Sequence, residues 1–402
     1  MLRNILLFSF LVGCGAPQAG WEKAPDGTTP RCQPLDCRTQ GVALDASDPA
    51  QAAIFYRMGC EQGDSESCTW LGYLEMNGQG ISKDEPSARE HSRLGCERGH
   101  SVGCRNYGWT LEKSIGGPAE YPSAWAAYVK GCDLKDAGAC VNAGVMLKEG
   151  LGVPKDDDAA VAFFQTSCTL LEVNGCTNLA WMAEFGRGME TDLVWAADLY
   201  EWACNQDDAT ACGSIANMYE KGLGVTANPD LAFSYVSKAC LLEEPISCAS
   251  LSHYFFSGVG VAKDEKQGFS YAKKACDLGD AVGCNNLGYA QETGRGTKTD
   301  MRAAVKNYRF SCENGFYRGC SNLGLAYLYG RGVGVDKTQG IYLLELACAG
   351  DDSVACDELV KENHPMPADL GAIELHFRRA CEATGYGPAC RAVEVIRRKM
   401  NP

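Results

Sequence analysis

Small and large apolar residues alternate along this chain in a pattern that returns every 36 residues. In each period a small residue stands eight positions before a cysteine and usually a large one four positions before it, as Ala196 and Tyr200 do before Cys204. With the apolar positions five and one before the cysteine, this spacing is the i, i+3, i+4, i+7 stripe of an amphipathic helix. The pattern therefore predicts one helix, called helix A, ahead of the first cysteine of each period.

A second helix, called helix B, is predicted after the next cysteine, where Leu and then a small residue follow at the third and fourth positions, as in Leu71-Gly72. It ends at a recurring Gly-x-Gly such as Gly150 and Gly152, whose first glycine fits a left-handed helix C-cap. An Asp or Asn a few residues later, such as Asp156, is suited to cap the next helix A. Each period therefore reads as an antiparallel helix pair in a repeat array.

The two cysteines of each period are separated by seven residues, and nine such pairs follow in register. One cysteine falls near the end of helix A and the other in the first turn of helix B, so a tight connection brings their Cα atoms within reach of a disulfide. Closing a loop of this size stabilises by about 2 to 3 kcal/mol, which compensates for helix faces rich in Ala and Gly. The predicted bridges join Cys60 to Cys68, Cys96 to Cys104, Cys132 to Cys140, Cys168 to Cys176, Cys204 to Cys212, Cys240 to Cys248, Cys276 to Cys284, Cys312 to Cys320 and Cys348 to Cys356.

Composition narrows the setting of this array. The chain has 402 residues, and its 23 cysteines are too many for a reduced cytosolic protein of this size, so an oxidising compartment is indicated. Zinc is a poor alternative, because the cysteine spacing is too wide and the five histidines do not follow the period. The net charge of −14 argues against nucleic acid and weakly favours a basic partner.

The N-terminus predicts export and a lipid anchor. Residues 1–13 join one positive charge to a short apolar run, which is typical of a signal peptide and too short to span a membrane. The tetrad Leu11-Val12-Gly13-Cys14 resembles a bacterial lipobox, in which Cys14 is acylated; an ordinary signal peptide with a chance cysteine is the alternative. Gly15 after this cysteine favours, by analogy, the outer membrane, facing the periplasm or the cell surface. The membrane is thus reached through a lipid anchor only.

The remaining boundaries follow from the period. Residues 14–47, rich in Gly, Pro, Asp and Thr, are predicted to be a flexible tether. Within it, Cys32 and Cys37 could close a small loop or brace the first repeat. Residues 48–361 hold nine repeats, and residues 362–402 are predicted to form a C-terminal capping repeat, in which a wider pair, Cys381 and Cys390, forms the last disulfide.

These motifs together resemble the Sel1-like repeat. Glu149 to Asp156 shows the Gly-x-Gly-Val turn followed by Lys-Asp at its fullest, and the cysteine-bridged form resembles the Helicobacter cysteine-rich proteins. The resemblance implies an all-α fold, a right-handed α/α solenoid related to tetratricopeptide repeats, acting as an adaptor or interaction surface. Tyr107-Gly108 and the turn from Ser114 to Gly117 depart from the pattern and put local packing there in doubt.

The resemblance also brings an enzymatic alternative, since some cysteine-rich relatives are described as penicillin-binding or β-lactamase-like. A serine β-lactamase needs Ser-x-x-Lys with Ser-Asp-Asn and Lys-Thr-Gly, and this chain has only Ser270-Tyr271-Ala272-Lys273. We interpret that match as chance on an exposed surface. No cofactor or metal motif is recognised, so no catalytic residue and no cofactor are predicted.

A binding role has better support. Helix A lines the concave surface in related repeats, and a second stripe beside its packing stripe carries aromatic residues that suit a protein or peptide partner. The candidate partner-binding residues are Trp195, Asp198, Trp202, Phe310 and Tyr342. Packing between repeats is the alternative for these side chains. The sequence therefore predicts a non-enzymatic interaction scaffold in the bacterial cell envelope, with a β-lactamase-like or penicillin-binding enzyme as the alternative.

Overall fold

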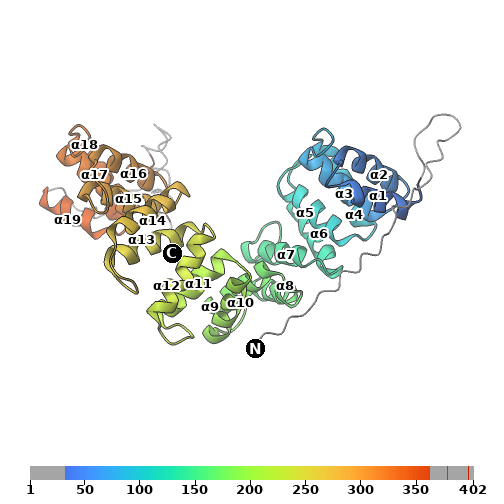
Figure 1. The fold of residues 1–402 in the computed structure, drawn as a ribbon, viewed down its shortest axis with the longest axis horizontal. Helices are drawn as coiled ribbons and strands as arrows, with labels where there is room; N and C mark the ends of the chain where they lie inside the picture. The colour runs from blue at the N-terminus through green and yellow to red at the C-terminus, as the bar shows by residue number, and fades with distance from the viewer. Residues whose placement is uncertain (1–31, 363–377, 379–396, 398–402) are drawn as a thin grey trace, which may run out of the picture. The chain divides into compact units, whose positions relative to one another are not determined.

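The computed structural model describes residues 32–362 together with Arg378 and Arg397, and in that part of the chain it contains helices and no strand. Figure 1 shows these helices as successive pairs along the chain. The described residues form two compact units, divided between Lys155 and Asp156, and each unit is described by itself.

The first unit contains seven helices among its described residues. They are α1 (Pro34–Leu44), α2 (Pro49–Glu61), α3 (Ser65–Asn77), α4 (Glu85–Glu97), α5 (Ser101–Glu112), α6 (Tyr121–Asp133) and α7 (Ala137–Glu149).

The described part of the second unit contains the remaining twelve. They are α8 (Asp157–Thr169), α9 (Val173–Phe185), α10 (Leu193–Asn205), α11 (Ala209–Lys221), α12 (Pro229–Leu241), α13 (Pro245–Ser257), α14 (Glu265–Asp277), α15 (Ala281–Thr293), α16 (Met301–Glu313), α17 (Tyr317–Tyr329), α18 (Lys337–Ala349) and α19 (Ser353–Lys361).

The predicted helix pairs are confirmed. Even-numbered helices from α2 to α18 correspond to helix A, and the odd-numbered helices that follow them correspond to helix B. The small residue eight positions before the first cysteine is buried in every helix A, and Tyr56, Tyr128, Tyr200 and Tyr308 are among the largest fully buried side chains. Packing of a small residue beside a large one thus fills most of the hairpins, whereas Ser92 in α4 and Ala272 in α14 are small at the second position.

The helix ends also follow the sequence. Asp156 and Asp192 accept a hydrogen bond from the backbone N–H three residues on, as N-caps do, and Asp84, Asn228, Asp264, Asp300 and Asp336 cap in the same way. The first glycine of each predicted turn is a left-handed C-cap, as at Gly222 with φ 70°. The second glycine is required by a close approach, because a Cβ on Gly224 would lie 2.1 Å from the carbonyl oxygen of Leu193. The divergent second repeat lacks this ending, since α5 stops at Lys113 with φ −92°.

The prediction of a flexible tether over residues 14–47 is wrong for residues 34–44, which form α1. Gly41 of α1 packs so closely on the ring of Tyr56 that a Cβ there would lie 2.5 Å from it. The buried contact is made by Gly41 and Cys37, which carry no apolar period, so the pattern could not show it. Cys37 is bonded to Cys32 and is fully buried, and Gln62 Nε2 donates to the Cys32 carbonyl at 3.0 Å, so this bridge braces the first hairpin.

A disulfide closes each of the nine described hairpins, as predicted. The Cα–Cα distance is 4.5 Å between Cys60 and Cys68 and 4.6 Å between Cys204 and Cys212, which is normal for a disulfide. The other seven bridges, within the same part of the chain, join Cys96 to Cys104, Cys132 to Cys140, Cys168 to Cys176, Cys240 to Cys248, Cys276 to Cys284, Cys312 to Cys320 and Cys348 to Cys356.

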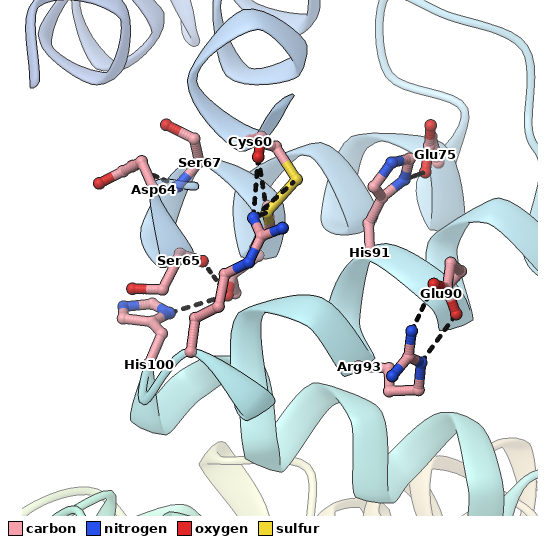
Figure 2. Close-up of a disulfide and its surroundings, with 12 residues drawn as sticks. Cys60, Asp64, Ser65, Ser67, Glu75, Glu90, His91, Arg93 and His100 are labelled. Carbon is pink, nitrogen blue, oxygen red and sulfur yellow. Dashed lines mark hydrogen bonds and ion pairs between the residues drawn. A yellow bond between two sulfur atoms is a disulfide. The ribbon is translucent and has the colours of Figure 1, made fainter. Parts of the chain in front are cut away.

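A cation from the next even-numbered helix or its end often satisfies the carbonyl beside the bridge. Lys238 Nζ donates to the Cys204 carbonyl at 2.7 Å and Lys274 Nζ to the Cys240 carbonyl at 2.6 Å. Figure 2 shows Cys60 and its disulfide. The equivalent contact at Cys60 comes from Arg98, whose Nη1 donates to the Cys60 carbonyl at 2.8 Å. Neighbouring hairpins are thereby linked end to end.

Several predictions fall on other parts of the chain. Cys14, the predicted bridge between Cys381 and Cys390, and the predicted capping repeat beyond residue 362 lie outside the described residues, apart from Arg378 and Arg397. The lipidation of Cys14 and the pairing of Cys381 with Cys390 therefore stay predictions.

Candidate functional site

The helices that follow the disulfides lie side by side within each unit. In the first unit α3 contacts α5 and α5 contacts α7, and in the second α13 contacts α15 and α15 contacts α17. Among the described residues of either unit, no two successive even-numbered helices approach as closely. We call the odd-numbered helices the inner row, because a solenoid is concave on the side where its repeats come closest together. The pairs α9/α11 and α11/α13 of this row, like α17/α19, lie further apart than the four pairs just named.

A hollow of about 390 Å³ occupies that wider part of the inner row. It is lined mainly by α9, α11 and α13, with Val236 from α12 and Glu244 from the turn before α13. Its apolar rim is open, since Phe185 is 56% exposed and Ile246 67%. The lining residues are Trp181, Glu184, Phe185, Thr210, Gly213, Ser214, Ala216, Asn217, Glu220, Val236, Glu244, Ile246, Ser247, Ser250 and Tyr254.

The hollow lies where two neighbouring positions of the repeat carry small side chains. The second residue after the second cysteine of a repeat is Asn in five hairpins: Asn106, Asn142, Asn178, Asn286 and Asn322. In α11 and α13 it is Ser214 and Ser250, and the residue before Ser214 is Gly213. A Cβ on Gly213 would lie 2.9 Å from Ser247 Oγ, so the missing side chain is part of the space. Short side chains on widely spaced helices leave the hollow.

Carboxylates face this space. Glu184 and Glu220 occupy the same position of successive inner-row helices, eight residues after the second cysteine, and Glu244 precedes α13. None of the described residues that line the hollow is basic. Glu184 and Glu220 form no ion pair with a basic residue in the described part of the chain.

Neutral donors hold these carboxylates in place. The hydroxyl of Tyr200 donates to Glu184 Oε2 at 3.0 Å, and the backbone N–H groups of Ile246 and Ser247 donate to Glu244. Burial, together with the charge of Glu220 beside it, raises the pKa of Tyr254 to about 12, so this phenol stays protonated at neutral pH. The donors fix the oxygens and leave their negative charge uncompensated. The site can therefore attract a cation.

The structure separates the predicted partner-binding residues from this hollow. Trp195 and Trp202 on α10 are half-buried against the apolar core around Tyr200, which corresponds to the alternative of packing within the array. Tyr342 on α18 is likewise half-buried against the neighbouring core. Asp198 and Phe310 are exposed. A partner-binding role for all five residues stays a prediction, because a half-buried ring still presents part of its surface to solvent.

Sequence reasoning placed the concave surface on helix A, whereas the hollow lies on the inner row formed by helix B. Replacement of the recurrent Asn by Ser214 and Ser250 is the signal that could have located it.

Ser270 and Lys273, the basis of the enzymatic alternative, lie on α14. Ser270 is exposed, and Lys273 Nζ is ion-paired with Asp277 Oδ2, one turn further along the same helix. Neither residue lines the hollow.

Two other kinds of site are not found in the residues that can be described. Within that part of the chain, no three His, Cys, Asp or Glu side chains gather where a metal ion could be held. A search of the same residues finds no helix with the length and apolar character needed to cross a membrane.

Two solved structures share this architecture. A protective antigen of uropathogenic Escherichia coli strains is similar with a TM-score of 0.55 and 23% identity, over 91% of this chain and 86% of that one. A Sel1 repeat protein from Oxalobacter formigenes is similar with a TM-score of 0.57 and 21% identity, over 83% and 94%. Cysteine-rich protein B of Helicobacter pylori is 32% identical over 33% of this chain and 96% of its own, with a TM-score of 0.28. No curated protein sequence matches the chain significantly.

The family comparison agrees in detail with the helix pattern. The Sel1 repeat model matches residues 38–64, 65–100, 137–170, 173–208, 209–243, 245–280, 281–316 and 318–352, and it passes over the divergent residues 101–136. Its repeats begin on the inner-row helices, so Cys60 closes one family repeat and Cys68 opens the next. In that phase the disulfides join successive repeats, although each one closes a single helical hairpin. Eight matched repeats on an all-helical array show that this chain belongs to the Sel1 repeat family.

Proposed function

We propose that this protein is a non-enzymatic scaffold of the bacterial cell envelope that binds a protein partner on its inner row. The hollow between α9, α11 and α13 carries this proposal, because it joins exposed apolar side chains to uncompensated carboxylates in one concave site. Ligand sites of proteins are usually concave, mostly apolar and supplied with a few polar groups that fix orientation. The Sel1 repeat fold is typical of interaction scaffolds, which supports the same role.

The envelope location is proposed from the cysteine chemistry and the N-terminus. Ten disulfides within residues 32–362 suit an oxidising compartment. The lipobox at Cys14 supports a lipoprotein of the outer membrane, facing the periplasm or the surface. Replacing Cys14 by Ser should move the exported protein from the membrane fraction to the soluble fraction, and a membrane-bound variant would contradict lipid anchoring at this residue.

Site-specific photocrosslinking in intact cells tests the interaction function. A photoreactive residue at Ile246, on the rim of the hollow, should give a discrete adduct with a partner protein. The same residue at Leu241, which is 75% exposed on α12, is the matched control and should give none. Absence of adducts from Ile246 and from other inner-row positions such as Tyr289 would contradict the scaffold. Turnover of nitrocefin that is lost in Ser270→Ala would contradict its non-enzymatic character.

A further inference from the structure

We propose that the hollow binds a lysine or arginine side chain presented by an extended segment of the partner. This inference rests on the interaction function proposed above and names the chemistry that the site selects. The volume of about 390 Å³ falls within the range of pockets that enclose small ligands, so one long side chain fits with its polar head inside.

The position eight residues after the second cysteine is a glutamate in several inner-row helices, and comparing these glutamates indicates why the occupant is a cation. Glu112 on α5 is ion-paired with Lys113 at 2.5 Å, and Glu292 on α15 with Arg331 at 2.7 Å. Both glutamates also accept a hydrogen bond from a buried tyrosine of the next helix, as Glu184 does. Glu184 differs in having no described basic partner, so its charge and that of Glu220 remain available to an incoming group.

The turn after the next inner-row helix explains the missing cation. The residue between the two glycines is Arg295 or Arg331 in the later turns, and each reaches back to the preceding inner-row helix. Arg295 Nη2 donates to the carbonyl of Phe256 at 2.8 Å, and Arg331 Nη1 donates to Glu292 at 2.7 Å. The residues that correspond to them are Leu223 for Glu184 and Val259 for Glu220, and neither can supply a charge. A cation from another molecule can therefore take that place.

The apolar rim suits the rest of such a side chain. Lysine and arginine bury their methylene stems along apolar surface while the charged head reaches a polar site. Phe185 and Ile246 provide exposed apolar surface at the mouth of the hollow, and the ring of Trp181 lies among its walls. That ring already accepts a cation, since the Arg187 guanidinium lies 5.3 Å from its centroid. Together the walls bind the stem and the carboxylates bind the head.

Selection of peptides from a phage-displayed random dodecapeptide library on the full, disulfide-intact chain tests the inference. Peptides enriched on the wild-type protein should align on one lysine or arginine, and the affinity of a representative synthetic peptide should fall as salt rises. In the variant that combines Glu184→Gln with Glu220→Gln, the dissociation constant of that peptide should rise about tenfold. Val259→Arg, which supplies a cation from within the chain, should have a similar effect without removing a carboxylate.

Asp230→Asn is the matched control, because it removes an exposed acid from α12 outside the hollow, and it should change the dissociation constant by less than about twofold. Thermal melting of each variant verifies that it is folded. Enriched peptides with no aligned basic residue, or equal binding by wild type and the double glutamine variant, would overturn this inference and leave the scaffold function standing. A library that yields no enriched peptide would overturn both.

Discussion

Two parts of the inner row in the second unit have equivalent positions of the repeat but present different surfaces. Between α15 and α17 the side chains interlock, as Asn322 Nδ2 donates to Asn285 Oδ1 at 2.8 Å and Arg331 neutralises Glu292. Between α9, α11 and α13, Ser214 occupies the position that Asn322 has in α17. Val259 occupies the position that Arg331 has in the turn after α17. A hollow with uncompensated carboxylates results. Substitutions at two equivalent positions of the repeat can thus change the surface of the array, while the packing inside the hairpins stays the same.

The largest expected effect is on stability, and it tests whether the hairpins of the two parts are packed alike. Tyr200 and Tyr308 fill the hairpins under the open and the closed part, and each is 1% exposed. Replacing either by Ala should lower the free energy of unfolding by about 3 to 5 kcal/mol, because a fully buried ring is lost. Urea unfolding of both variants should show similar losses. Phe replacements are the control and should cost about 1 kcal/mol, the value of the hydroxyl hydrogen bond, since Phe164 already serves at this position of α8. A large difference between the two sites would show that the hairpins are not equivalent.

The disulfides should contribute next, and equally on both sides of the comparison. Replacing Cys204 and Cys212 together by Ala should lower the free energy of unfolding by about 2 to 3 kcal/mol, because a short loop in the unfolded chain is released. The equivalent change at Cys312 and Cys320 should cost about the same amount. Urea unfolding under non-reducing conditions measures both. Losses below about 0.5 kcal/mol would show that packing alone holds the hairpins.

Alkaline pH should distinguish the tyrosine at the hollow from the tyrosines buried in the hairpins. Burial, followed by the neighbouring carboxylate, raises the pKa of Tyr200 and Tyr308 far above the ordinary value of 10.0, whereas the pKa of Tyr254 at the hollow rises only to about 12. Because the unfolded chain releases these protons near pH 10, stability is complete below that pH and falls above it by about 1.4 kcal/mol per pH unit for each buried tyrosine.

Ultraviolet absorbance during base titration follows this ionisation. Tyr254 should titrate in the folded protein, and Tyr200 and Tyr308 only on unfolding. Glu220→Gln should lower the pKa of Tyr254 without returning it to 10.0, because burial is the larger cause. An unchanged pKa would show that the carboxylate does not face the phenol.

Filling the hollow should convert the open part toward the closed one. Ser214→Asn with Ser250→Asn restores the residue that five other hairpins carry, so the free energy of unfolding should change by less than about 1 kcal/mol. Binding of a peptide selected on the wild-type chain should nevertheless fall about tenfold, because its side chain loses space. Isothermal titration calorimetry measures this. Ser321→Ala on α17, a buried serine outside the hollow, is the control, and an equal loss of affinity there would contradict the assignment.

The contrast between these parts also marks what the sequence could predict. The 36-residue period and the positions of the cysteines determined the helix pairs, their glycine ends and the bridge in each hairpin, because local spacing decides all three. Helix α1 was missed because its contact is made by Gly41, which belongs to no apolar stripe. The hollow was missed because it depends on how closely α9, α11 and α13 approach, and a single repeat does not contain that distance. The roles of Trp195 and Trp202 also depend on how closely neighbouring helices approach, because a half-buried aromatic ring can pack on a core or face a partner.

The smallest effect on stability, and the sharpest test of the comparison, comes from moving the cation of the closed part. Arg331 is 41% exposed, so Arg331→Val should lower the free energy of unfolding by less than about 1 kcal/mol. It leaves Glu292 with the hydroxyl of Tyr308 as a donor at 2.6 Å, which is the state of Glu184 in the wild-type hollow.

Without the space that Ser214 and Ser250 provide, however, the Arg331→Val variant should gain no measurable affinity for the basic peptide at Glu292. Combining Arg331→Val with Asn286→Ser and Asn322→Ser should create that affinity, measured by calorimetry in a background where Glu184→Gln and Glu220→Gln silence the original site. If Arg331→Val alone creates it, charge without volume is sufficient, and the hollow is not what selects the partner.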